Sequence, residues 1–103
     1  MNRNRGFHII TFILPNHPCK ITFGWLLKKG RRWKGMSIQM LFLKLLLQYR
    51  NLEITFSLLE QIENDVLEIT NPEYDQIVDA ICEVLEIDKN YAQEIRNQTL
   101  ATA

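Results

Sequence analysis

The sequence predicts a mainly α-helical protein: a small helical bundle of about three to four helices from residue 37 onward, after an N-terminal segment that is disordered or a marginal β-hairpin. Apolar residues recur at helical spacing in two stripes, from Leu45 to Ile69 and from Tyr74 to Leu85, and each stripe has the spacing of one face of an α-helix. Residues that commonly begin helices stand ahead of these stripes. The hydrophobic content of 47% is ordinary for a globular protein, so we expect a folded chain.

The charges are segregated along the chain. All 12 acidic residues lie at Glu53 or later, whereas ten of the 12 Lys and Arg residues lie before it. The first 52 residues therefore carry a formal +10 and the last 51 carry 2 − 12 = −10. This pattern divides the chain into a basic N-terminal segment, residues 1–35, and an acidic helical bundle, residues 36–103. Parts of opposite sign attract each other within a chain or between copies.

The basic N-terminal segment lacks helical spacing. Phe7–Leu14 and Ile21–Leu27 are rich in β-branched and aromatic residues, and Pro15–Pro18 between them is typical of a turn, so a hairpin is predicted. Lys28–Gly35 reads as a basic loop because it holds two glycines. Two strands alone are marginal in water, so we expect residues 1–35 to be less ordered than the rest.

An alternative interpretation removes this segment from the functional product. Arg31-Arg32, if encoded AGG-AGG, would resemble a ribosome-positioning sequence at a suitable distance from Met36. Translation would then start at Met36, and the product would carry four basic and 12 acidic residues.

The helices are predicted in order from the apolar stripes. The first runs from Ser37 to Tyr49, and a break near Asn51 separates it from a second over Leu52–Ile69, because β-branched residues follow there. Asn71 is the N-cap of a third helix, Pro72–Leu85, and Asp88 opens a short fourth one. The two-residue connection predicts that the second and third helices form an antiparallel hairpin. The residues predicted to fill their interface are Phe56, Leu59, Ile62, Ile77, Ile81 and Leu85, and Tyr91, Ala92 and Ile95 should face inward from the fourth helix.

The first helix is apolar on nearly every face. Only Gln39, Lys44 and Gln48 interrupt it, and a helix of this kind must be covered on all sides. A small bundle has too few elements to do this. We therefore expect either the N-terminal hairpin to cover it or a homodimer to form through residues 38–49.

An acidic ridge is the best surface feature of the third helix. Its carboxylates are spaced by four, four and three positions, which places them on one face, opposite Ile77 and Ile81. Like charges at this spacing repel, and a basic partner would relieve the repulsion. The alternative is an ordinary solvated face. The predicted partner-binding residues are Asp75, Asp79, Glu83 and Glu86.

The basic loop is the alternative binding site. Cations contact phosphates and Trp stacks on unpaired bases, so it suits nucleic acid. It could equally lie on an anionic membrane surface or be solvated. The residues concerned are Lys28, Lys29, Arg31, Arg32, Trp33 and Lys34.

Ile77–Asn97 has the outline of a helix-turn-helix, with Glu86 where such motifs usually have Gly. Its second helix carries only two cations, Lys89 and Arg96, against two acids. DNA affinity rests largely on neutralising phosphates, so we favour an ordinary αα-corner.

Catalytic and metal-binding signatures are missing. The histidines are His8 and His17, and no zinc spacing, phosphate-binding glycine motif or orienting triad accompanies them. We expect no enzymatic activity, no cofactor and no metal. Cys19 and Cys82 form no disulfide framework, which favours the reducing cytoplasm, and no run is long enough to span a membrane.

Together these observations predict a small non-enzymatic protein that binds a macromolecule through its acidic ridge. The expected partner is a basic protein surface or a second copy of the chain. The alternatives are nucleic-acid binding through the basic N-terminal segment, or a small protein without a discrete biochemical role.

Overall fold

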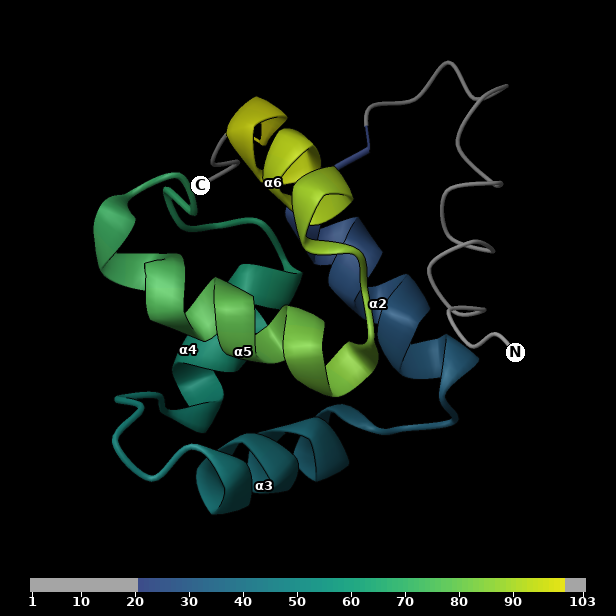
Figure 1. The fold of residues 1–103 in the computed structure, drawn as a ribbon, viewed down its shortest axis with the longest axis vertical. Coiled ribbons are helices and arrows are strands. Elements are labelled where there is room, and N and C mark those ends of the chain that lie inside the picture. Colours follow the sequence, from purple (N-terminus) through teal and green to yellow (C-terminus); the bar gives the residue numbers. More distant parts are fainter. Residues whose placement is uncertain (1–20, 100–103) are drawn as a thin grey trace.

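The computed structural model describes residues 21–99, and all regular structure within this range is helical (Figure 1). The predicted fold class, a small and mainly α-helical bundle of about three to four helices from residue 37 onward, is confirmed, with four α-helices between residues 37 and 99. The elements are α2 (Phe23–Trp33), α3 (Ile38–Gln48), α4 (Phe56–Glu63), the 3-10 turn η1 (Pro72–Tyr74), α5 (Asp75–Leu85) and α6 (Lys89–Gln98).

Side-chain caps fix where the helices begin. Ser37 and Asp88 accept hydrogen bonds from backbone N–H groups three residues later, at 3.1 and 2.9 Å, and Asn71 accepts one from Glu73 N at 3.0 Å. The caps Asn71 and Asp88 are as predicted, whereas the sequence predicts Ser37 only as the start of its helix. Thr22 and Thr55 cap α2 and α4 in the same way. Local polar residues therefore set where most of these helices begin.

The strand and loop predicted for Ile21–Leu27 and Lys28–Gly35 are wrong, because the chain is helical from Phe23 to Trp33. Leu26 and Leu27 are fully buried. This part of the basic segment therefore supplies core side chains, contrary to the expectation that it contributes little order. The other predicted hairpin strand, Phe7–Leu14, and its turn lie outside the described residues.

The predicted helix over Leu52–Ile69 is also wrong in its extent. The break near Asn51 is confirmed, but α4 ends at Glu63, and Asp65 adopts a left-handed φ of 59°. The chain then runs without regular helix to η1, so α4 and α5 do not form the predicted hairpin. Instead α4 packs mainly on α2 and α3, and α5 packs on α2, α3, α6 and η1.

The core is one continuous cluster to which all five α-helices of residues 21–99 contribute. Of the predicted interface residues only Phe56 lies outside it; its ring packs edge-on against Phe42, with centroids 5.5 Å apart. Of the residues predicted to face inward from α6, Tyr91 is only partly buried. The predicted core residues that are buried are Leu59, Ile62, Ile77, Ile81, Leu85, Ala92 and Ile95.

No helix in residues 21–99 has the length and apolar character needed to cross a membrane.

Candidate interaction surfaces

The α3 outer face, defined here as Met40, Leu43, Leu46 and Leu47, is apolar and open to solvent. These side chains are 48%, 56%, 40% and 73% exposed. The opposite side of the helix carries Leu41 and Leu45, which are fully buried. One face of α3 therefore holds the helix in the core, while the other has no covering element among residues 21–99.

The structure gives each carboxylate of the acidic ridge a partner within the chain. Asp75 pairs with Arg96 at 2.8 Å and Asp79 with Lys89 at 3.4 Å. Glu86 pairs with Lys34 at 2.9 Å. The ridge is therefore less strongly negative than its sequence indicates. Because the three carboxylates remain 64–68% exposed, these pairs stabilise the fold little and leave the oxygens accessible.

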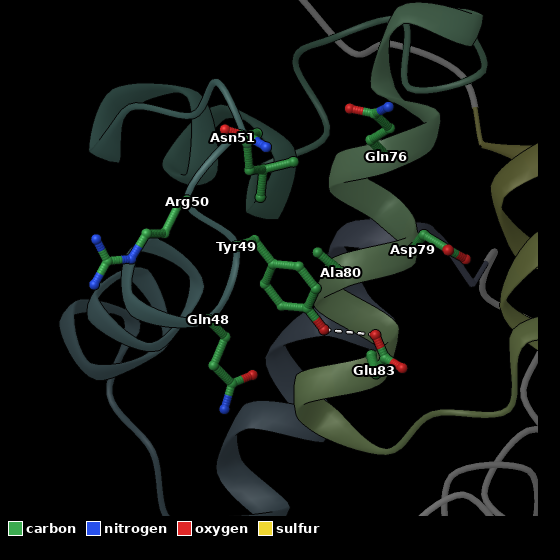
Figure 2. A pocket seen from close by; sticks show the side chains of 9 residues that line it. Gln48, Tyr49, Arg50, Asn51, Gln76, Asp79, Ala80 and Glu83 are labelled. Carbon is green, nitrogen blue, oxygen red and sulfur yellow. Dashed lines mark hydrogen bonds between the residues drawn. The ribbon is translucent and has the colours of Figure 1, made fainter.

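Glu83, the fourth ridge residue, borders a hollow of about 380 Å³ (Figure 2). The hollow lies between α5 and the end of α3 with its following turn. In Figure 2 the ring of Tyr49 extends across it toward α5, and its hydroxyl donates a 2.6 Å hydrogen bond to Glu83 Oε1. The same view shows Arg50 pointing away from α5. The lining residues are Gln48, Tyr49, Arg50, Asn51, Leu52, Gln76, Asp79, Ala80 and Glu83.

A second hollow of about 410 Å³ adjoins the first and shares Asn51, Leu52 and Gln76 with it. We call the two together the α5 groove. Its second half adds apolar side chains and two further carboxylates, so the groove combines a mixed polar and apolar lining with four acids. The added lining residues are Glu53, Leu58, Glu73, Tyr74 and Ile77.

The groove holds its two tyrosines in the neutral form. The hydrogen bond to Glu83, together with burial and the nearby negative charge, raises the pKa of Tyr49 to about 12. Burial, followed by the interaction with Glu73, raises the pKa of Tyr74. Sequence reasoning missed the groove because Tyr49 and Glu83 are 34 positions apart and no local pattern connects them.

The predicted nucleic-acid site lies on a helix rather than a loop. Helical spacing places Trp25, Lys28, Lys29, Arg32 and Trp33 together on what we call the α2 solvent face. All five are partly or fully exposed, and Lys29 Nζ lies 5.8 Å from the centroid of the Trp25 ring.

The other two predicted residues of this site, Arg31 and Lys34, are engaged with the rest of the fold. Arg31 Nε contacts Glu63 Oε2 at 2.8 Å, and its Nη1 donates to the Met36 carbonyl at 3.0 Å. Lys34 pairs with Glu86. The structure thus brings together Lys28, Lys29, Arg32 and Trp33 and separates Arg31 and Lys34 from them.

The helix-turn-helix outline is present as a tight corner between α5 and α6. Glu86 adopts a left-handed φ of 58° at its centre, the conformation that favours Gly. Both cations of α6 are engaged with α5: Lys89 with Asp79, and Arg96 with Asp75. Arg96 also donates to the Ile69 and Asn71 carbonyls at 2.7 and 3.0 Å. The second helix is therefore poorly equipped to contact phosphates.

Among residues 21–99, no group of three or more His, Cys, Asp and Glu side chains is arranged to hold a metal ion. His8, His17 and Cys19 lie outside the described residues. No protein-family model, curated protein or solved structure matches this chain.

Proposed function

We propose that this is a small, non-enzymatic interaction protein that self-associates through the α3 outer face. The observation that supports this function is the concentration of exposed apolar side chains on one short helix. Of the six large hydrophobic residues exposed within residues 21–99, four belong to α3, and the other two are Trp33 and Val66. A contiguous apolar surface on a folded domain is typical of a protein–protein contact.

A second copy of the chain is the partner that fits this face. Lys44 lies at its edge, and the face itself contains no charged residue, so an equally apolar surface is its natural complement. In an antiparallel pair about a two-fold axis, Leu43 would meet its own counterpart and Met40 would meet Leu46. Such a contact removes both apolar stripes from water at once.

Sedimentation equilibrium of the full chain tests the proposal. We expect a dimer at tens of micromolar, and we expect Leu43→Lys to be monomeric because it places two charges at the axis. Val66→Lys is the matched control, since Val66 is 38% exposed but lies outside α3; it should remain dimeric. A monomeric wild-type chain, or a Leu43→Lys chain that still dimerises, would contradict the proposal.

Binding of single-stranded nucleic acid is the second candidate function. It is favoured by the α2 solvent face, where three cations and two Trp rings share one side of a helix. Cations contact phosphates and the rings stack on bases, so affinity should fall steeply with salt.

Quenching of Trp fluorescence by an oligodeoxythymidine tests this function. We expect binding at about 50 mM salt that fades by about 200 mM. Lys28→Gln/Arg32→Gln should abolish it, whereas the equally neutralising Lys44→Gln/Arg50→Gln should not. Equal binding by both double variants would exclude the α2 solvent face as the site.

A further inference from the structure

We propose that residues 1–20, the part of the basic N-terminal segment that precedes α2, dock into the α5 groove of their own chain. This contact concerns a different surface from the α3 outer face. It is inferred from the groove lining, from the charge and apolar content of the segment, and from the length of chain that precedes α2.

The groove has the chemistry to bind a basic, partly apolar peptide. Leu52, Leu58 and the rings of Tyr49 and Tyr74 are partly buried and provide its apolar contact area, with the buried Ile77 and Ala80 beneath them. Carboxylates stand at both ends: Asp79 and Glu83 at one, Glu53 and Glu73 at the other. The single cation of the lining, Arg50, points away from α5 in Figure 2.

Residues 1–20 match this surface. They contain Arg3, Arg5 and Lys20, no acidic residue, and the apolar run Phe7–Leu14. Residues 21–99 carry nine Lys and Arg against 12 acids, a net charge of 9 − 12 = −3, so the folded body as a whole attracts a segment of charge +3. The apolar residues of the segment would contact the apolar side chains of the groove, and its basic residues would pair with the carboxylates at the two ends.

The segment is long enough to reach the groove. An extended chain spans roughly 3.3 Å per residue, so 20 residues reach about 65 Å from Ile21. The largest dimension of the fold is 37 Å. Because the segment is tethered, its effective concentration at the groove is on the order of millimolar, and modest intrinsic affinity suffices.

Charge also favours the α5 groove over the α3 outer face as the docking site of residues 1–20. The α3 outer face adjoins Lys44 and carries no carboxylate. A basic segment would find apolar contact there but no acidic group to pair with its Lys and Arg residues. The groove offers both, and we therefore assign the segment to the groove and a second copy to the α3 outer face.

Limited trypsin digestion of the full chain, followed by mass spectrometry, tests the docking. The groove variant is Glu53→Gln/Glu73→Gln/Glu83→Gln, in which the amide introduced at position 83 can still accept the Tyr49 hydrogen bond. The control, Glu60→Gln/Glu68→Gln/Glu94→Gln, removes equal charge from exposed positions that do not line the groove. Cleavage after Arg5 reports the undocked fraction, provided that circular dichroism shows all chains folded.

We expect the groove variant to be cut at Arg5 at least about fivefold faster than the wild type and the control, because cleavage follows the population of the open state. Raising salt from about 50 to about 500 mM should accelerate cleavage of the wild type toward the rate of the groove variant. Equal rates in all three chains would overturn the proposal.

The same digestion distinguishes docking within one chain from contact between copies. Protection should be independent of protein concentration and should persist in the Leu43→Lys background, so it does not depend on the proposed dimer. Protection that appears only at high concentration would overturn docking within the chain.

Discussion

Gly24 is the glycine of residues 21–99 that leaves the least room for a side chain. It lies where the start of α2 meets the turn after α4, and Asp65 accepts hydrogen bonds there from the Thr22 hydroxyl at 2.5 Å and from Gly24 N–H at 2.9 Å. A Cβ at Gly24 would collide with the Glu63 carbonyl oxygen and lie 2.7 Å from Asp65 Oδ1. The missing side chain is what allows α2 and α4 to approach.

Gly24→Ala should therefore lower the free energy of unfolding by roughly 2–3 kcal/mol, as overpacking against a fixed backbone does. Gly30→Ala is the matched comparison. Its Cβ would meet only the flexible side-chain ends of Ile87 and Leu85, at 3.0 and 3.3 Å. Ala favours helix over Gly by about 1 kcal/mol, so the net effect of Gly30→Ala should be small. Urea denaturation measures both, and equal effects of the two substitutions would contradict the close approach at Gly24.

Cys82 should be chemically inert in the folded protein. It is 2% exposed, and burial, with a smaller contribution from Asp79, raises its pKa from 9.0 to about 12. The raised pKa favours the neutral thiol, so this contribution to stability is present below pH 9 and is lost as the pH rises through 12. At pH 8 the thiolate fraction should be roughly a thousandfold lower than in the unfolded chain.

The measurement is the rate of thiol modification in a Cys19→Ser chain, in which Cys82 is the only thiol. We expect slow modification at pH 8 that becomes rapid in urea. Rapid modification of the folded chain would place Cys82 at an accessible site, contrary to its burial.

Among the elements, those with local signals could be predicted. The change of periodicity at Ser37 indicated the start of α3. The caps Asn71 and Asp88 indicated the starts of η1 and α6, because a cap bonds only to residues two or three positions away. The exposed apolar side of α3 followed from its composition. In both cases the deciding interactions lie within one helix.

The elements that were missed depend on distant contacts. In α2, Gly24 and Gly30 resemble loop residues, yet they serve close packing against the 63–65 turn and Ile87. The end of α4 is tied to α2 by Asp65, more than 40 positions from Thr22 and Gly24. The α5 groove likewise combines the turn after α3 with a later helix. No local periodicity indicates such pairings.

The role of α2 as a core element is tested by Leu26→Ala. Leu26 is fully buried, as is Ile81 of α5, so both substitutions should lower the free energy of unfolding by about 2–4 kcal/mol. Denaturation in urea compares them directly. A Leu26→Ala effect below about 1 kcal/mol, beside a large Ile81→Ala effect, would mean that α2 packs loosely on the bundle.

Over the whole molecule, basic residues from the first part of the chain form ion pairs with acidic residues from the second part. Arg31 and Lys34 of the basic part pair with Glu63 and Glu86 of the acidic part, and α2 packs on α4, α5 and α6. The attraction expected between the two parts therefore operates within the chain. Among residues 21–99, the α3 outer face carries four of the six exposed large hydrophobic side chains.

Disulfide trapping examines whether this face is the surface of self-association. In a Cys19→Ser background, Leu43→Cys would place a thiol on the proposed two-fold axis, where its counterpart lies within the reach of a disulfide. Gln61→Cys, on an exposed position of α4, is the control. We predict that mild oxidation converts the Leu43→Cys chain to a covalent dimer at low micromolar concentration while the Gln61→Cys chain forms no covalent dimer. Equal or absent cross-linking in the two chains would contradict association through α3.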